Sequence, residues 1–398
     1  MEKITHQERL KPWMGFVFFA VVMAVFIRVC VPLQGRYGIP GLVATELILL
    51  GLSIIYCLIR RVSLKEVFPI KKITVKDFFG CVILLVGVYM LSILSVIIME
   101  IVYPPCAAEA EGISDMLYGN MNFISTIIVV ALLPAVCEES VYRGAILSSF
   151  RGMKREWVAI TLVGLFFSIN HLSILRGPFT WIFGMALAYV VVKRNNILLT
   201  VMMHFMVNSF SATLGYIFSK IPGLMESAEA SSAEVGMDSL GIIMIFACAA
   251  PVLLVTGAML IDPKGHKAKR YIWAGILTAV LFAGGIVCTG IGVMNGSLMS
   301  TSAQYQVESE GQENSYGFTV EEERDYTVVV TMMSSSGDYH ILVVNTDDGS
   351  IACEGDMSDG SIRTYSSTVS LDEGNYCVTI YNGSGSEGQE VTASIRVQ

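Results

Sequence analysis

Residues 123–143 read FISTIIVVALLPAVCEESVYR, an apolar run that ends in two adjacent glutamates and an arginine. A charged side chain at the centre of a bilayer costs at least about 2.5 kcal/mol, so ionisable residues inside membrane segments are functional candidates by default. Three such charges lie within six positions, namely Glu138, Glu139 and Arg143. This stretch therefore predicts a membrane helix that carries a functional site.

The composition of the whole chain indicates a polytopic membrane protein. Of its 398 residues, 54% are hydrophobic and 15% are charged, against about 25% charged in an average soluble domain. Runs of about 17–25 apolar residues span a bilayer as helices. We predict nine, with the fifth and sixth short: 14–33, 41–59, 78–103, 122–150, 158–173, 178–193, 197–219, 239–261 and 271–294. The first run lacks a small-residue cleavage site and is interpreted as an uncleaved anchor.

Lysines and arginines fall in every second connection between the predicted spans. Their clusters lie within residues 3–11, 60–76, 151–155, 193–194 and 264–270, whereas the alternate connections are short or acidic. Because connections rich in Lys and Arg stay on the cytoplasmic side, we expect a cytoplasmic N-terminus and an extracytoplasmic C-terminus in the plasma membrane. The sequence shows no basic face of the kind that would predict nucleic-acid binding.

A change in composition near residues 296–301 predicts two domains, with residues 1–299 in the membrane and 300–398 outside it. The tail from residue 300 has 17 acidic residues against three arginines, and its apolar residues alternate with period two. About seven short strands separated by Asp-Gly-type turns favour a β-sandwich. The expected fold is thus an all-α membrane helix bundle followed by a small all-β sandwich. Its two cysteines, Cys353 and Cys377, form one disulfide or stay free thiols.

The glutamate pair divides into two roles on a helix. Glu139 and Arg143 are four residues apart with the acid first, which is the spacing of an ion pair along one face. A buried ion pair that braces the bundle explains these two residues but leaves Glu138 surplus. Glu138 is rotated by about 100° from its neighbour, so it remains available for proton transfer.

Two further predicted spans carry histidines. Phe167 and His171 are one turn apart in the fifth span, and His204 and Asn208 are one turn apart in the seventh. Each pair has a packing alternative, because imidazole and amide groups also join membrane helices by hydrogen bonds. His204 and Asn208 are equally suited to donate hydrogen bonds to a developing oxyanion.

The three elements are expected at a similar depth in the membrane. At about 1.5 Å of rise per residue, Glu138, His171 and Asn208 lie between about 16 and 20 Å from the cytoplasmic ends of their helices. His204 comes out nearer to that end, at about 10 Å. Pro134, one turn before Glu138, is expected to disrupt the hydrogen bonds of its helix and to open room at the site.

Arg28 in the first span and Glu46 in the second both lie near the outer ends of their helices. They either form an ion pair or leave Arg28 extended to the interface. Neither alternative gives them a catalytic role.

The ordered set Glu-Glu-x-x-x-Arg, Phe-x-x-x-His and His-x-x-x-Asn, each in its own predicted helix, resembles the CPBP family. This family contains CAAX prenyl endopeptidases and bacterial bacteriocin-processing and self-immunity proteins. The resemblance covers about residues 120–215. The tail from Gly317 onward is similar to bacterial pre-peptidase C-terminal domains, which are small extracellular accessory modules.

The CPBP resemblance implies an intramembrane endopeptidase that acts on membrane-embedded or lipid-anchored peptides or proteins. It implies three roles: water activation by Glu138 and His171, oxyanion binding by His204 and Asn208, and support by Glu139, Arg143 and Phe167. Whether the substrate is prenylated stays open, as does any ligand of the β-domain. The accessory module and the absence of targeting signals favour a bacterial cell.

Two mechanisms are compatible with this resemblance, one dependent on glutamate and one on zinc. Glu138, His171 and His204 would supply three zinc ligands, with water as the fourth. No histidine of the chain is followed by glutamate, so a His-Glu-x-x-His zinc motif is absent. Glu138 would also have to serve as both ligand and base. We therefore expect no cofactor, with zinc as the alternative.

Two other classes of function compete with a protease. A non-catalytic scaffold or bacteriocin-immunity-type protein would use the same fold to bind a membrane partner, but the complete set of polar residues favours catalysis. A transporter also places charges within the membrane. It would be expected to show internal repeats or broken helices in matching halves, and neither is clear in the sequence.

Overall fold

The computed structural model describes residues 10–103, 121–220, 236–265, 269–294, 299–357 and 362–398. It divides into two compact units, of which the first ends at Thr289 and the second runs from Gly290 to Gln398. The predicted boundary near residues 296–301 lies partly outside the described residues. The first unit is helical, and the second contains the last residues of the helix Lys269–Met294 followed by strands, as the sequence predicts.

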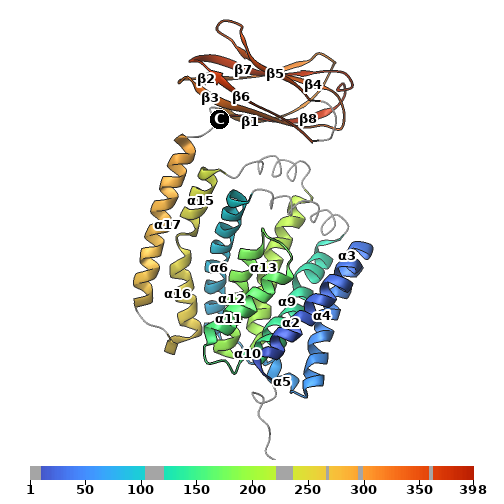
Figure 1. The fold of residues 1–398 in the computed structure, drawn as a ribbon, viewed down its shortest axis with the longest axis vertical. Coiled ribbons are helices and arrows are strands. Elements are labelled where there is room, and N and C mark those ends of the chain that lie inside the picture. Colours follow the sequence, from blue (N-terminus) through green and yellow to red (C-terminus); the bar gives the residue numbers. More distant parts are fainter. Residues whose placement is uncertain (1–9, 104–120, 221–235, 266–268, 295–298, 358–361) are drawn as a thin grey trace, which may run out of the picture. The chain divides into compact units, whose positions relative to one another are not determined.

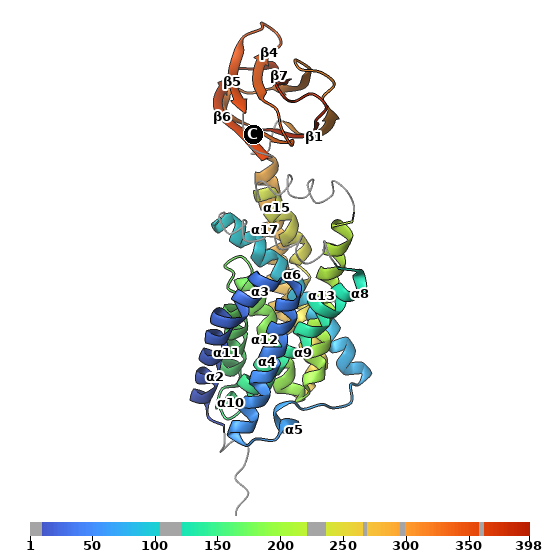
Figure 2. The same cartoon turned by 90° about the vertical axis from the view of Figure 1, so that its right-hand side faces the viewer.

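The first unit is a bundle whose helices run side by side along a common direction (Figures 1 and 2). Seven helical segments in the described part of the chain are long and apolar enough to cross a membrane, so this is a multi-pass membrane protein. The first half of the bundle contains α2 (Pro12–Val25), η1 (Phe26–Cys30), α3 (Val31–Tyr37), α4 (Ile39–Arg60), α5 (Leu64–Val67) and α6 (Val75–Val102). A second group contains α8 (Phe123–Thr126), η3 (Ile127–Leu132), α9 (Leu133–Glu139), η4 (Ser140–Ile146) and α10 (Leu147–Phe150). The last contains α11 (Glu156–Asn170), α12 (Gly177–Arg194), α13 (Ile197–Phe218), α15 (Met237–Ala247), α16 (Ala250–Ile261), η5 (Pro263–Gly265) and α17 (Lys269–Met294).

The fifth and sixth predicted spans correspond to α11 and α12, which are shorter or less apolar than the seven spanning segments. The two helices approach closely through glycines, because a Cβ atom at Gly184 would lie 2.9 Å from the Cα atom of Gly164. Small residues permit such close backbone contact between membrane helices. The two helices form a hairpin, so the chain leaves them on the side from which it entered. The predicted sides of the two termini are therefore the same whether or not these helices cross the membrane.

Two π-helical turns precede prolines in the bundle. The turn η3 lies just before Pro134, and the turn η1 lies just before Pro32. Proline has no N–H to donate to the carbonyl four residues earlier, and its ring crowds that carbonyl. A wider turn relieves this crowding, so the predicted disruption at Pro134 is confirmed.

The basic connections gather at one end of the bundle. Lys193 forms an ion pair with Glu156, and Arg194 forms one with Asp77. Arg151 donates a hydrogen bond to the carbonyl of Glu66 at 3.0 Å. These contacts tie the end of α12 to the starts of α6 and α11, and the segment before α11 to α5. Three of the predicted basic connections, 60–76, 151–155 and 193–194, therefore meet at one end of the bundle.

The second unit is a β-sandwich of two four-stranded antiparallel sheets (Figure 1). One sheet has the order β1 (Met299–Gln306), β8 (Glu390–Val397), β3 (Arg324–Met333) and β6 (Ile362–Leu371). The other has the order β2 (Glu313–Val320), β7 (Gly374–Asn382), β4 (Tyr339–Asn345) and β5 (Ile351–Met357). Both sheets contribute fully buried residues to one core, such as the cross-strand pairs Val330–Ile395 and Ile341–Ile380. The sandwich is confirmed, with eight described strands instead of about seven.

The β-domain cysteines are free thiols in this structure. Cys353 lies on β5 and Cys377 on β7, and each pairs with a residue of the intervening strand β4. Strands in a sheet are about 4.8 Å apart, so the two cysteines are separated by about two strand spacings. A disulfide requires Cα atoms within about 7 Å. Of the two open alternatives, the structure has the free thiols.

Arg28 and Glu46 make no ion pair among the described residues. The Arg28 side chain is exposed, whereas Glu46 is buried with 4% exposure. The ion-pair alternative is therefore not the one observed, and Glu46 is left inside the bundle.

Candidate active site

Glu139 is the fixed member of the glutamate pair. It is fully buried, and its Oε1 atom accepts hydrogen bonds from Arg143 Nη1 at 2.8 Å and from His204 Nδ1 at 3.0 Å. The bond to Arg143 confirms the ion pair that the spacing predicted. The bond to His204 joins α9 to α13. Glu139 is thus committed to holding two other side chains in place.

Arg143 is held from three directions. Besides its bond to Glu139, its Nη2 atom donates to the carbonyl of Gly184 at 3.2 Å. Its guanidinium lies over the ring of Phe167, with Cζ 4.4 Å from the ring centroid. A side chain at Gly184 would collide with α11, because its Cβ would also lie 3.2 Å from the Phe167 ring. The hydrogen bond to Gly184 and the glycine contact between α11 and α12 are features that sequence reasoning missed.

Glu138 differs from its neighbour in exposure and in partners. Its side chain is 14% exposed, and its Oε2 atom has no hydrogen-bond partner among the described residues. That atom lies 3.9 Å from Nε2 of His204, which is too long for a hydrogen bond. Glu138 therefore keeps a carboxylate oxygen available beside an imidazole.

Phe167 lies at the centre of the cluster. Its ring contacts His171 at a centroid distance of 4.8 Å, His204 at 5.7 Å and Tyr142 at 5.2 Å. Edge-to-face aromatic contacts of this kind fix ring orientations. The supporting position predicted for Phe167 thus has a geometric basis, because the ring touches both histidines and the guanidinium.

His171 lies at the C-terminal end of α11 and not inside the helix, as the span prediction had placed it. The helix ends at Asn170, and Leu172 takes a left-handed backbone conformation with φ 49°. His171 Nδ1 lies 2.8 Å from the carbonyl of Phe167. Because a carbonyl only accepts, Nδ1 carries the hydrogen and Nε2 is left as the acceptor. His171 contacts the other site residues through Phe167.

Asn208 lies one turn beyond His204 on α13. Its Nδ2 atom donates to the carbonyl of Val130 at 3.4 Å. Val130 lies four residues before Pro134, so its carbonyl is the one that loses its usual α-helical donor. Asn208 is therefore already bound to the Val130 carbonyl, through a hydrogen bond that is long and weak.

The contacts bring the predicted residues of α9, η4, α11 and α13 together. His204 was expected nearer to the cytoplasmic end than Glu138, yet it contacts Glu139. The π-helical turn η4 between Glu139 and Leu147 explains part of this difference, because such a turn fits more residues into a given length than an α-helix.

Glu46 is a buried carboxylate that the sequence analysis left without a role. Its Oε2 atom has no hydrogen-bond partner among the described side chains. It belongs to α4, which packs against α9 and η4. The only sequence signal for this placement was its charge within an apolar run.

The three candidate zinc ligands do not form a metal site as they are placed. No group of three or more His, Cys, Asp or Glu side chains within the described ranges is arranged to hold a metal ion. Glu138 and His204 are neighbours, but His171 is turned to the carbonyl of Phe167.

Residues 120–210 match the family described as type II CAAX prenyl endopeptidase Rce1-like. The resemblance drawn from the three motifs is confirmed over these residues. The match contains all seven candidate site residues. It supports intramembrane endopeptidase activity in general and fits a membrane-associated substrate.

None of the curated proteins matches the chain significantly. Solved structures similar to part of this chain include the pre-peptidase C-terminal domain of a Bacillus anthracis collagenase. That likeness has 14% identity, covers 25% of this chain and 90% of that chain, and has a TM-score of 0.20. A second is a carbohydrate-binding module of Cellvibrio mixtus lichenase 5A in complex with cellotriose. It has 13% identity, covers 26% of this chain and 98% of that chain, and has a TM-score of 0.21.

Proposed function

We propose that this protein is an intramembrane endopeptidase in which Glu138 is the general base. The observation that carries the proposal is the division of labour between two adjacent carboxylates. Glu139 is fully buried and its Oε1 atom holds Arg143 and His204, whereas Glu138 holds neither, is 14% exposed and has an Oε2 atom without a hydrogen-bond partner among the described residues. A general base needs such an available oxygen within reach of the water that it deprotonates.

In the proposed reaction, Glu138 takes a proton from a water molecule as the water oxygen attacks the peptide carbonyl. His171 orients that water through Nε2, its free acceptor. Collapse of the tetrahedral intermediate breaks the C–N bond, and Glu138 returns the proton to the leaving nitrogen. Atoms and charges balance without any metal or cofactor.

His204 and Asn208 are proposed to bind the oxyanion. His204 is oriented by Glu139 through Nδ1, so its Nε2 atom points into the site and donates when it carries a hydrogen. Asn208 has to exchange its weak bond to Val130 for one to the oxyanion. Removing one oxyanion donor lowers turnover by about 10²–10³ in well-studied hydrolases.

Purified protein in proteoliposomes, incubated with a library of quenched membrane peptides, tests the proposal. We expect Glu138→Gln to lose cleavage while the matched variant Glu156→Gln, a glutamate at the exposed end of α11, retains it. Cleavage should survive treatment of the wild type with a chelator. Loss on chelation would instead favour zinc. Absence of cleavage by folded wild type would favour the scaffold or immunity-type alternative.

The substrate is proposed to be a membrane-embedded or lipid-anchored peptide or protein. Peptide pairs that differ only in a prenyl group decide whether the lipid is recognised. We further propose that the N-terminus is cytoplasmic and the β-domain extracytoplasmic in the plasma membrane, because the basic residues gather at one end of the bundle. Labelling single cysteines introduced at Lys264 and at Ser350 in intact cells tests this: only the second should react with an impermeant reagent.

A further inference from the structure

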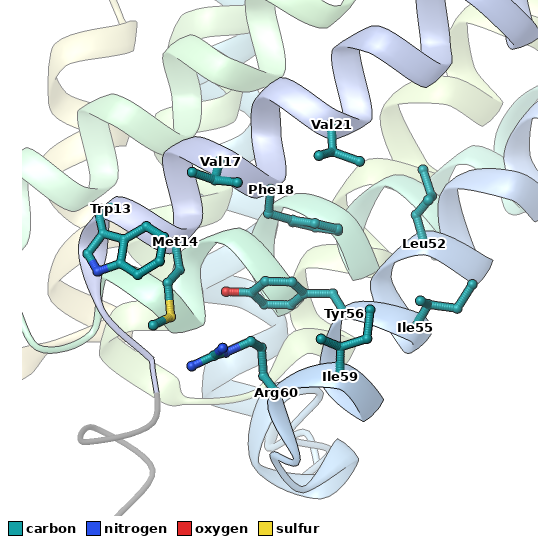
Figure 3. A pocket seen from close by; sticks show the side chains of 10 residues that line it. All are labelled: Trp13, Met14, Val17, Phe18, Val21, Leu52, Ile55, Tyr56, Ile59 and Arg60. Atoms are coloured by element: carbon teal, nitrogen blue, oxygen red, sulfur yellow. The ribbon is translucent and has the colours of Figure 1, made fainter.

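A groove runs between α2 and α4 on the surface of the membrane bundle (Figure 3). It has a volume of about 300 Å³, which lies at the lower limit of small-molecule sites. The stacked rings of Phe18 and Tyr56, with centroids 4.3 Å apart, form its floor. Tyr56 is fixed from behind by a 2.7 Å hydrogen bond to Ser149. The floor is therefore a built surface of the bundle.

The walls of the groove are apolar and exposed. Val17 and Val21 of α2 are 53% and 45% exposed, and Ile55 and Ile59 of α4 are 51% and 71% exposed. Side chains of this kind on a membrane helix face hydrocarbon, so the groove opens toward lipid.

One end of the groove is polar. Arg60, in the last turn of α4, and Trp13, in the first turn of α2, both line this end of the groove (Figure 3). Lys11 and Arg61 are exposed neighbours of these two residues along the chain. Trp and Arg concentrate at the level of lipid headgroups, and guanidinium groups bind phosphate in a forked geometry. The charge at this end thus complements an anionic headgroup.

The length of the groove distinguishes a lipid chain from a partner helix. From Trp13 to Val21 the helix rises about 12 Å. The hydrocarbon of one leaflet is about 15 Å thick, whereas a spanning helix needs about 30 Å of contact. The groove therefore accommodates one acyl chain of one leaflet.

We propose that the groove between α2 and α4 binds one anionic glycerophospholipid, with an acyl chain on Phe18 and Tyr56 and the phosphate at Arg60. The lipid comes from the leaflet at the basic end of the bundle. Bound there, it links the first two membrane helices, and through Tyr56 and Ser149 it contacts the segment that ends the helix of Glu138. This site is independent of the proposed peptidase chemistry.

Native mass spectrometry of delipidated full-length protein tests the proposal with two probes that share acyl chains, phosphatidylglycerol and phosphatidylcholine. We expect one phosphatidylglycerol to bind at least about fivefold more tightly than phosphatidylcholine. This difference in affinity is what one basic residue near an anionic headgroup contributes. Arg60→Gln should abolish this preference. The matched variant Arg155→Gln, an exposed arginine at the same end of the bundle, should keep it.

A second variant keeps Arg60 and fills the groove. Val17 is half exposed, so Val17→Trp is compatible with folding and should remove the bound lipid of either kind. Equal binding of both lipids by the wild type would overturn the proposal, as would unchanged phosphatidylglycerol binding in both Arg60→Gln and Val17→Trp. A dimer that Val17→Trp dissociates would also overturn it, because a second copy would then be the occupant.

Discussion

The β-sandwich and the helix of Glu138 differ in regularity. Along β8 of the sandwich, every second residue from Val391 to Val397 is fully buried. Around Glu138, by contrast, a proline, two π-helical turns and three charges interrupt the apolar helix. The polar atoms differ in the same way. Oxygens of Glu138 and Glu139 and the hydroxyl of Tyr142 are buried without partners, while in the described β-domain this holds only for Asn314 Nδ2. Buried unsatisfied polar groups are costly and concentrate at functional sites. The sandwich thus follows local rules for stability, whereas the bundle departs from them where chemistry is proposed.

The largest expected effect separates the two glutamates. Glu138→Gln should lower turnover by about 10²–10⁴, the contribution of a general base, with little change in melting temperature. Glu139→Gln leaves Arg143 buried without its counter-charge, which costs about 3–5 kcal/mol of stability. Turnover in proteoliposomes and thermal unfolding of both variants check this. Equal losses of stability would show that the two carboxylates are not divided as proposed.

The next largest effect is expected in the β-domain, whose stability should be independent of the active site in the membrane bundle. Ile380→Ala removes part of a fully buried side chain and should destabilise this unit by about 2–5 kcal/mol. Hydrogen exchange of the full-length protein should show faster exchange in β4 and β7, with unchanged exchange in α9 and α13. Peptidase turnover should equal that of the wild type. A fall in turnover would mean that the β-domain takes part in activity.

A smaller effect is expected at the contact between α11 and α12. Gly184→Ala places a methyl group 2.9 Å from Gly164 Cα, and such overpacking costs about 1–3 kcal/mol. Because Arg143 donates to the carbonyl of Gly184, turnover should fall together with thermal stability. Gly275→Ala on α17, where a Cβ meets nothing within 4 Å, is the control that should leave both unchanged.

The smallest effect is expected at a turn of the β-domain. The backbone N–H and side-chain amide of Asn375 donate to Asp347, which lowers the pKa of this carboxyl from its usual value. A lowered folded-state pKa gives stability above the unfolded pKa of about 3.9, which is lost as the pH falls further. Asp347→Asn should therefore lower the unfolding midpoint of the β-domain slightly at about pH 6 and less at about pH 3. An equal difference at both pH values would contradict this.

The sequence predicted much of the site because its signals are local. The Glu139–Arg143 pair follows from helical spacing, and the wide turn before Pro134 follows from a missing N–H. The bond of His204 to Glu139 was not predictable, because two residues 65 positions apart meet only through the packing of α9 on α13. The same reason hid Glu46 and the Gly184 carbonyl.

By itself, the sequence determined the class of each domain, since apolar run length and period-two alternation report hydrophobic burial directly. It also determined which side chains are candidates for chemistry, because charges in apolar helices are too costly to be incidental. Helical spacing already indicated that Glu139 pairs with Arg143, whereas the packing of the helices decided that Glu139 also holds His204 and that Arg143 donates to the Gly184 carbonyl. Packing also decided that His171 lies at the end of a helix and that strand β4 separates Cys353 from Cys377. These outcomes depend on distances between elements, which side-chain packing sets and local spacing does not encode.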